Sequence, residues 1–306
     1  MANLINASTI EYTPLNNPDY FLKSLRQGVT LKNDYVRVIP GVTKEARIKK
    51  MVLNDPILQE SNRDCAWTPI QRIDITDKLM SVKDWKVNFS QCLSDLDNLY
   101  SEQLWSSGAK KTELPEGVEA AMMEEINTQM GMDIEKKIWD GFTTELLASP
   151  NSIKVAGVNI NASNVLTELA KIYENCPTVV LSEGWFNPEK AAARIFVDID
   201  TYRYLQIALG TTPTAYVVTA PNWTVGADGK IAYMGVEVVA VTGLQPNTAV
   251  MGSRDNMIVL TDAVTDLTYI QAQLLPFPND DTYAIKAELR LGTGIIFDDE
   301  MVIYSI

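Results

Sequence analysis

The sequence contains no histidine in its 306 residues. Without histidine there is no Ser-His-Asp or Cys-His nucleophile pair, no histidine general base and no histidine metal ligand. This absence excludes many hydrolases and zinc enzymes and leaves enzymes that work through carboxylates, lysine or tyrosine. Hydrophobic residues make up 46% of the chain and charged residues 21%, so we expect one large or two smaller globular domains rather than disorder.

Cysteine and long apolar runs are also scarce. Cys65, Cys92 and Cys176 stand far apart and form no CxxC pair, so neither a zinc knuckle nor a redox motif is indicated. An odd count without a disulfide framework fits a reducing cytoplasm. No apolar run approaches the roughly 20 residues of a membrane span, and the first residues lack the pattern of a signal peptide. We therefore expect no contact with a membrane.

Positive charge is scarce in most of the chain. The formal net charge is −13, which argues against tight general binding of nucleic acid. Residues 1–90 carry 13 basic and 10 acidic residues, whereas residues 91–306 carry 13 and 29. One interpretation is chance together with a solvated acidic surface. The other is that the basic first third lies against the acidic body of another copy.

The first 90 residues predict two extended segments. Residues 1–42 are interrupted by prolines and Gly28 but remain rich in apolar side chains, which favours an arm that packs on something else. Residues 44–53 are basic and form either a strand or a short helix. Apolar and polar residues alternate over 70–76 and 85–89, so we expect a long hairpin with a polar tip.

Residues 115–142 carry the strongest helix signal. Apolar residues recur every fourth position, and Pro115 suits the first helical position. The opposite face carries charges and is expected to face solvent: Glu124, Glu125, Glu135, Lys136 and Lys137. At 1.5 Å per residue this helix would be about 40 Å long, which suggests a structural spine.

Residues 150–245 predict alternating helices and strands with mixed pairing. We expect helices over 161–175, capped by Asn161 or Ser163, over a short segment from Asn187, and over 198–209. Strands are expected over 178–181 and 194–197, with a strand pair or one bent strand over 230–241. Residues 226–230 predict a hairpin turn rather than a phosphate-binding loop.

The C-terminal residues carry the clearest strand signal. Residues 283–291 alternate strictly between apolar and polar side chains. Gly292 and Gly294 are expected to mark a turn or bulge, and residues 301–304 a closing strand.

Acidic pairs are the strongest candidates for metal-ligating or catalytic residues. Asp280-Asp281 and Asp298-Asp299-Glu300 could ligate calcium, but a solvated turn or strand end is favoured. Asp198 and Asp200 could serve acid–base work, but Asp200 is more simply a helix N-cap. We therefore assign no catalytic residue, no cofactor and no metal ligand.

Basic and aromatic side chains of the first third are the candidates for contacts between subunits. Lys44, Lys49 and Lys50 form a basic cluster, which is either a solvated face or a contact with an acidic neighbour. The full set of candidate contact residues is Tyr12, Phe21, Arg37, Lys44, Arg47, Lys49, Lys50 and Arg63.

The order of these segments resembles the major capsid proteins of tailed bacteriophages, which have the Hong Kong 97-type shell fold. Residues 284–304, AIKAELRLGTGIIFDDEMVIY, are similar to the closing strands of that family, which return to its spine helix. Residues 235–262 resemble its passage from the axial lobe back to the peripheral lobe. The resemblance rests on order and character rather than on an invariant motif.

The resemblance implies an α+β fold in four parts. These are an N-terminal arm (1–42), an extended hairpin loop (43–90), a peripheral domain with the long spine helix (91–150 and 246–306) and an axial α/β domain (151–245). We expect no long scaffolding region before the arm, which would imply a separate scaffold or none. Nothing identifies a partner for a covalent crosslink, so none is predicted.

The resemblance also implies a structural, non-enzymatic function. The chain would self-assemble into hexamers and pentamers of an icosahedral shell around double-stranded DNA, in the host bacterial cytoplasm and then in the virion capsid. Implied partners are further copies, other virion proteins such as portal, scaffold or decoration proteins, and DNA held weakly and non-specifically. Two alternatives stay open: an encapsulin-type compartment shell and a carboxylate-based enzyme.

Overall fold

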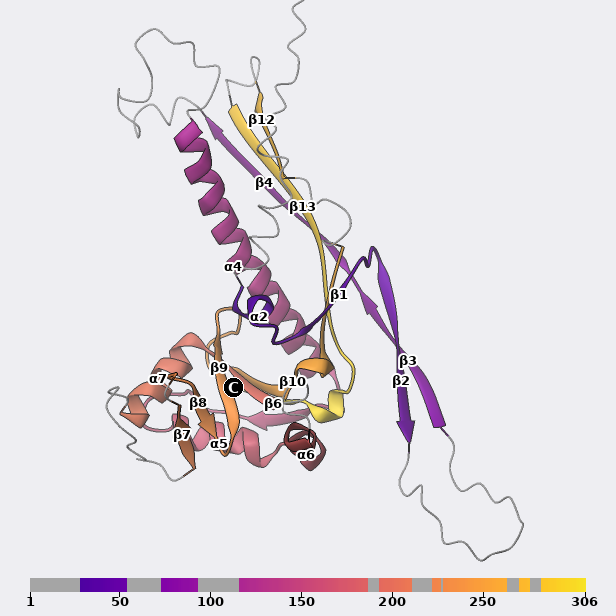
Figure 1. Ribbon diagram of the computed structural model, residues 1–306, viewed down its shortest axis with the longest axis vertical. Helices are drawn as coiled ribbons and strands as arrows, with labels where there is room; N and C mark the ends of the chain where they lie inside the picture. Colours follow the sequence, from indigo (N-terminus) through magenta and orange to yellow (C-terminus); the bar gives the residue numbers. More distant parts are fainter. Residues whose placement is uncertain are drawn as a thin grey trace, which may run out of the picture.

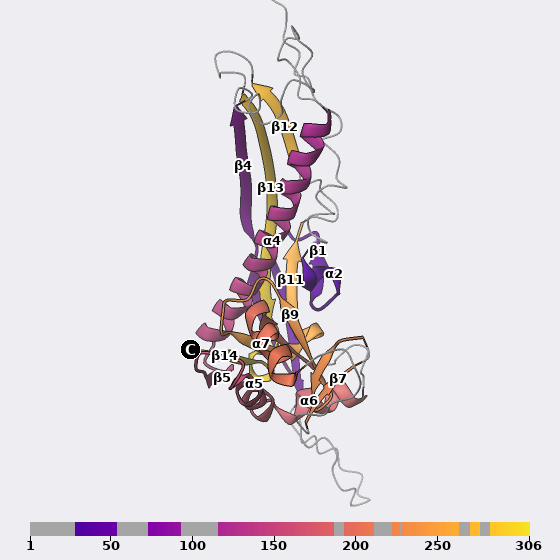
Figure 2. The same cartoon turned by 90° about the vertical axis from the view of Figure 1, so that its left-hand side faces the viewer.

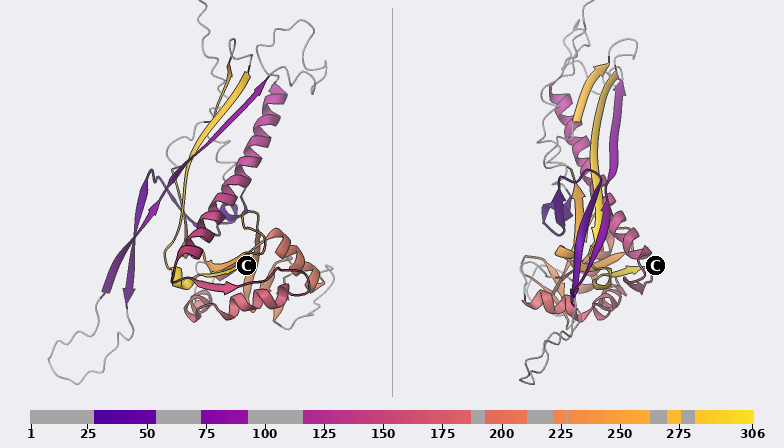
Figure 3. Two further views of the ribbon diagram at one scale, coloured as in Figure 1. Left: turned by 180° about the vertical axis from the view of Figure 1, so that it is seen from behind. Right: turned by 90° about the vertical axis from the view of Figure 1, so that its right-hand side faces the viewer.

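The computed structural model describes residues 28–53, 73–92, 116–186, 193–210, 222–226, 228–262, 270–275 and 282–306. A long helix runs beside extended strands, a compact lobe lies at its lower end, and a two-stranded hairpin projects from the same end (Figure 1). The perpendicular view is much narrower (Figure 2). From behind, the hairpin and the lobe diverge from the helix on opposite sides (Figure 3).

Helix α4 (Glu116–Ala148) confirms the expected spine and extends beyond Phe142 to Ala148. Its 33 residues span about 50 Å. The four-residue apolar stripe faces the core: Met130, Ile134, Ile138, Phe142 and Leu146 are buried. Burial of this stripe supplies the free energy that stabilises the helix. Its position is therefore determined by packing against the core rather than by the helix propensity of its residues.

A five-stranded sheet packs along α4. Its strands are β1 (Arg37–Pro40), β4 (Lys83–Cys92), β11 (Met257–Thr261), β12 (Ile270–Leu275) and β13 (Thr282–Ile295). The long strand β13 pairs with β4 and β12 in its first part and with β11 in its last part, and β1 pairs with β11 in parallel. The predicted alternation is confirmed, since its apolar members are buried: Tyr283, Ile285, Ala287, Leu289 and Leu291.

Gly292 and Gly294 lie inside β13, so the predicted turn or bulge is wrong. A Cβ atom at Gly292 would lie 2.5 Å from the carbonyl oxygen of Ser81, and one at Gly294 would lie 2.3 Å from Sδ of Met80. These glycines therefore let the root of the hairpin approach the β13 backbone closely. A glycine in a strand marks such an approach as readily as a bulge.

The lobe is built on a seven-stranded sheet of mixed pairing, in the order β5-β14-β10-β6-β9-β8-β7. Its strands are β5 (Ile153–Ala156), β6 (Ala193–Asp198), β7 (Trp223–Val225), β8 (Ile231–Tyr233), β9 (Val236–Val241), β10 (Ala249–Ser253) and β14 (Val302–Ser305). The expected strand at 194–197, the strand pair over 230–241 and the turn at 226–230 are confirmed.

Three helices belong to the lobe: α5 (Val165–Glu174), α6 (Thr178–Phe186) and α7 (Ile199–Leu209). The predicted strand at 178–181 is wrong, because these residues begin α6. Pro177 accepts the first backbone bonds of that helix, from the amides of Val180 and Leu181, and proline favours a helix start over a strand. The helix expected from Asn187 lies at residues 187–192, outside the described residues.

The helix caps also differ from expectation. Asp198, not Asp200, caps α7, since its carboxylate accepts a hydrogen bond from the Thr201 amide at 3.1 Å. Asp200 is exposed and pairs with Arg203 at 3.2 Å. In α5 the N-cap position is Asn164 rather than Asn161 or Ser163. Gly210 ends α7 in the left-handed conformation, as the sequence predicts.

Glu135 is fully buried, so its predicted place on the solvent face of α4 is wrong. The short helix α2 (Val29–Lys32) covers it, and its carboxylate accepts bonds from the amide and hydroxyl of Thr30 and from Nε1 of Trp139. A Cβ atom at Gly28 would lie 2.5 Å from a carboxylate oxygen of Glu135, so a larger residue there would displace that carboxylate. Residues 28–32 are thereby fastened to the spine.

This buried carboxyl predicts a pH dependence. Burial raises the pKa of Glu135 above its ordinary value, although the bonds from Thr30 and Trp139 oppose the shift. The folded state therefore holds this proton more tightly than the unfolded state, and stability falls as pH rises from the ordinary carboxyl pKa through the raised one. Subtracting the stability of Glu135→Gln from that of the wild type by denaturant titration at several pH values should give this decline. A difference independent of pH would contradict it.

Candidate functional site

The projecting hairpin consists of β2 (Glu45–Leu53) and β3 (Ile73–Ser81), paired antiparallel. The hairpin expected from the runs at 70–76 and 85–89 is therefore wrong in its pairing. Residues 73–81 pair with β2, whereas residues 85–89 belong to β4 and pair with β13. Side chains directly opposite one another share a face of such a ribbon. The register therefore divides the hairpin into an inner face, which includes Ala46, Lys50, Lys78 and Met80, and an outer face.

The inner face fastens the root of the hairpin to the body. Met80 is buried against Ile258 and Leu260 of β11, with Ala46 and Ile48 packed beside them. A two-stranded ribbon alone is marginally stable in water. This small apolar cluster therefore provides the support that the hairpin lacks by itself.

Lys78 adds an ion cluster at the same place. Its ammonium lies 2.7 Å from the carboxylate of Glu145 on α4 and 2.7 Å from that of Asp298. Partial burial by itself lowers the pKa of Lys78, but the bonds to Asp298 and Glu145 outweigh it and raise the pKa. Ser149 donates a further bond to Asp298 at 3.0 Å. Lys78 thus joins the hairpin to the last turns of the spine and to the 3₁₀ helix η2 (Asp298–Glu300).

The acidic run at residues 298–300 takes part in this attachment. Besides the bonds of Asp298, the Asp299 carboxylate lies 3.7 Å from Nζ of Lys50, which also stands 4.4 Å over the ring of Phe297. The pair Asp280-Asp281 lies outside the described residues. Within the described ranges, no group of three or more Cys, Asp or Glu residues is placed to hold a metal ion.

The outer face is exposed along its whole described length. Four large apolar side chains lie on it, each more than half exposed: Met51, Ile73, Ile75 and Leu79. Arg47 and Lys49 stand among them and are also exposed. Asp77, opposite Lys49, and Glu45 are exposed on the same face, and the Lys49–Asp77 pair separates Leu79 from Met51 and Ile75. Large apolar side chains exposed together on one face suit contact with another molecule. We call the four apolar and two basic residues the outer hairpin face.

The structure separates the candidate contact residues. Arg47 and Lys49 lie together on the outer hairpin face, Lys50 lies on the inner face, and Lys44 and Arg37 are exposed beside the root and on β1. Tyr12, Phe21 and Arg63 lie outside the described residues. The sequence analysis missed the apolar members of the face. Ile73, Ile75 and Leu79 are separated by even numbers of residues in a nine-residue strand, so they lie on one face of it. This spacing could have identified them.

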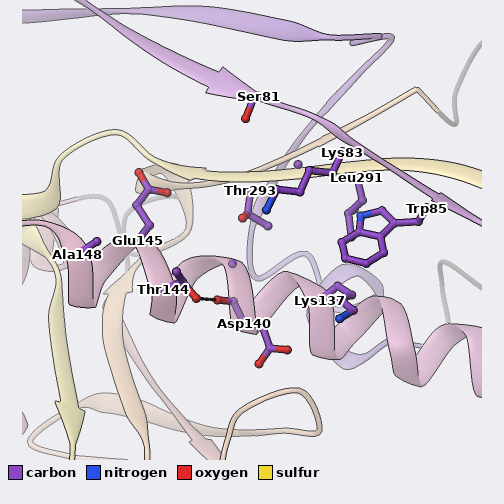
Figure 4. A pocket seen from close by; sticks show the side chains of 12 residues that line it. Ser81, Lys83, Trp85, Lys137, Asp140, Thr144, Glu145, Ala148, Leu291 and Thr293 are labelled. Carbon is purple, nitrogen blue, oxygen red and sulfur yellow. Dashed lines mark hydrogen bonds between the residues drawn. The ribbon is translucent and has the colours of Figure 1, made fainter.

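A second feature is a cleft of about 430 Å³ between α4 and the strands β4 and β13, close to the hairpin root (Figure 4). Lys83 and Trp85 line it from β4, and Lys137 lines it from α4, with its ammonium 4.7 Å from the centre of the Trp85 ring. Ser81, Thr144, Thr293, Asp140 and Glu145 complete the polar lining.

Two of the lining residues are carboxylates, and each has a hydrogen-bond or ion-pair partner. Glu145 binds Lys78, and Asp140 accepts a bond from Gln245 at 3.1 Å, with its carboxylate directed away from Lys83 (Figure 4). In the part of the chain that the structure describes, no carboxylate lies within 4.0 Å of the Lys83 or Lys137 ammonium. The lining of the cleft therefore carries two lysines and two carboxylates, so its formal charges balance.

Among the described helices, none combines the length and apolar content that crossing a membrane requires. No protein-family model matches the chain. A search of curated protein sequences finds no match either.

Solved structures match most of the length of the chain. The satellite phage P4 procapsid, solved with its size determination protein, has a TM-score of 0.59 and 8% identity over 94% of this chain and 89% of that one. Mycobacterium phage Ogopogo gives 0.56 and 14% identity over 91% and 92%. A virus-like particle from Pyrococcus furiosus gives 0.51 and 13% identity over 94% and 96%. The likeness confirms the expected α+β, Hong Kong 97-type shell fold.

Proposed function

We propose that this chain is the structural major capsid protein of a tailed bacteriophage, which self-assembles into hexamers and pentamers of an icosahedral shell around double-stranded DNA. The observation that carries the proposal is the outer hairpin face, a row of exposed apolar and basic side chains on a ribbon fastened to the body. A surface presented on such a projection suits contact with another copy rather than with a small molecule.

The proposed division of the chain keeps the four parts of the family. Residues 1–42 form the arm, 43–90 the extended loop, 91–150 and 246–306 the peripheral domain, and 151–245 the axial domain. The described structure adds detail at the boundaries. The last residues of the extended loop lie in β4, which pairs in the five-stranded sheet. Strands β10 and β14, from the peripheral domain, pair in the seven-stranded sheet.

The hairpin gives a heterologous interface, because the surface that it offers differs from the surface that receives it. Interfaces of this kind form closed rings when the rotation from each copy to the next adds up to one full turn. A net charge of −13 keeps such a shell from gripping the phosphates of an enclosed genome. Other virion proteins, such as portal, scaffold or decoration proteins, are further proposed partners, and the virion capsid is the proposed location. The role is structural and needs no catalytic residue or cofactor.

An encapsulin-type compartment is the second candidate, favoured by the likeness to the Pyrococcus furiosus particle. The contents of the particles distinguish the two. Shells isolated from cells that naturally produce this chain should contain nuclease-resistant double-stranded DNA. Shells filled instead with one enriched enzyme, identified by mass spectrometry of the released contents, would favour the compartment and overturn the phage assignment.

A further inference from the structure

We infer that the outer edge of β4 receives β3 from the hairpin of a second copy of this chain, which adds to it as an antiparallel strand. The inference rests on the proposed assembly and deepens it, because it names the surface that receives the hairpin. Strand β4 pairs with β13 along its whole length, and no other described strand pairs with it. It therefore ends the five-stranded sheet on that side (Figure 2).

Both edges that would meet are open to solvent. Residues 83–90 of β4 are exposed apart from Trp85 and Val87, which are half-buried. Residues 73–77 of β3 are all exposed, and among the described strands β3 pairs only with β2. An edge strand with unpaired backbone amides and carbonyls is a template for a strand from another chain.

One antiparallel register matches the two edges residue by residue. It sets acidic residues opposite lysines and isoleucines opposite apolar residues of β4: Asp74–Lys86, Asp77–Lys83, Ile75–Trp85 and Ile73–Val87. Opposite charges directly across a ladder stabilise it, whereas like charges destabilise it. A shift of two residues in one direction sets Asp74 opposite Asp84, and a shift in the other direction leaves neither aspartate opposite a lysine.

The four charged side chains of this register are available for it. Asp74, Asp77, Lys83 and Lys86 are exposed, and none takes part in an ion pair with the described residues. A parallel pairing could also join the two aspartates to the two lysines, but it would set Ile75 opposite Asp84. The antiparallel pairing is therefore favoured, since it matches the apolar residues as well.

The added strand continues the polar face of the existing sheet. On this face Arg290 of β13 donates to Asp84 of β4 at 2.8 Å, and Glu288 of β13 stands opposite Lys86 of β4. Charge thus already alternates from one strand to the next. Asp74 of the added strand would lie on the other side of Lys86 and extend that alternation.

The added strand also continues the apolar face, which packs toward α4. Trp85 and Val87 lie on this face, opposite Leu289 and Ala287 of β13, and stay half-buried because the sheet ends beside them. Isoleucines from the outer hairpin face would cover them. The donating segment, 73–77, differs from the receiving segment, 83–87, so the contact is heterologous and can pass from copy to copy around a ring.

Disulfide formation tests the register directly. A full-length chain whose own three cysteines are replaced by alanine receives Ile75→Cys and Trp85→Cys, and its assembled particles are oxidised and run on a non-reducing gel. Residues directly opposite in an antiparallel pair have Cα atoms about 4.5–5.5 Å apart, which a disulfide can span. We expect a ladder of linked chains that continues beyond the dimer.

The matched control places the second cysteine at Phe89, on the same face of β4 but about 13 Å further along the strand. Ile75→Cys with Phe89→Cys should form no linked chains. Linkage through Phe89→Cys in place of Trp85→Cys, products that stop at the dimer, or no linkage in assembled particles would overturn the inference.

Exchange of the charges tests the contact without cysteines. Asp74→Lys with Asp77→Lys should raise the concentration needed for assembly at least about tenfold, because two lysines then face the lysines of β4. Adding Lys83→Asp and Lys86→Asp to the same chain restores opposite charges and should restore assembly. All four side chains are exposed, so the thermal transition of the free subunit should stay unchanged.

Glu125→Lys with Asp133→Lys, on the exposed face of α4, is the control for net charge and should assemble as the wild type does. Normal assembly of the aspartate variant, or no recovery in the fourfold variant, overturns the edge contact and leaves the shell assignment intact. A wild-type chain that stays monomeric contradicts both.

Discussion

Replacing both Ile75 and Leu79 by glutamate should abolish shell assembly while leaving the subunit folded. These side chains are 57% and 53% exposed in the free subunit, so a carboxylate in their place remains hydrated and costs the fold little. The proposed interface covers the same position with a neighbouring copy in the assembled shell. An ionised carboxylate without a partner there costs several kcal/mol, which is enough to prevent association.

Sedimentation velocity checks this expectation, with circular dichroism and thermal melting as the measure of folding. The matched control is Ile75→Val with Leu79→Met, which keeps both side chains apolar and should assemble as the wild type does. Normal yields of particles from the glutamate variant would mean that the outer hairpin face is not an interface. Loss of the thermal transition would mean that the side chains support the fold instead.

Trp139→Ala should destabilise the unassembled subunit by about 3–5 kcal/mol. Trp139 has no exposed surface and packs against Phe142, with ring centres 5.8 Å apart, and against Phe196 of β6, at 4.9 Å. Its Nε1 also donates to Oγ1 of Thr30 at 2.8 Å. The one side chain therefore joins the spine, the lobe and α2, and its removal leaves a cavity where all three meet.

Urea titration of the free subunit measures this loss. Met132→Ala on the same helix is the control, because its side chain is 48% exposed and its loss should cost no more than about 0.5 kcal/mol. A cost below about 1 kcal/mol for Trp139→Ala would contradict the place given to this residue at the centre of the core.

Periodic segments of the sequence could be predicted because a single buried face sets their pattern. The four-residue stripe of α4 and the alternation in β13 each follow from packing on one side, and both are confirmed. The strand pair over 230–241 and the Gly210 end of α7 follow from turn chemistry that is local to the chain.

Features set by distant segments could not be predicted in the same way. Glu135 reads as a solvent-facing charge until Thr30 and Gly28, more than 100 residues earlier, lie over it. Gly292 and Gly294 read as a turn because the approach of Ser81 and Met80 depends on the tertiary fold. Pro177 opens a helix where the valines that follow it favour a strand by propensity.

Only part of the candidate site could be predicted from the sequence, for a similar reason. The basic residues of the hairpin were recognised by their charge, but the sequence alone does not assign them to faces. The register of β2 and β3 separates Arg47 and Lys49 from Lys50, and it places them beside exposed apolar side chains. The cleft joins Lys83 to Lys137, which are distant in sequence and become neighbours only when α4 packs on β4 and β13.

Electron microscopy of the purified full-length chain tests the central claim most directly. We expect closed particles of uniform diameter, whose surfaces resolve into rings of six and five subunits with each hairpin lying on a neighbouring copy. A discrete species below a few hundred kilodaltons, with no rings or shells at any protein concentration tested, would contradict the assignment of this chain as a shell subunit.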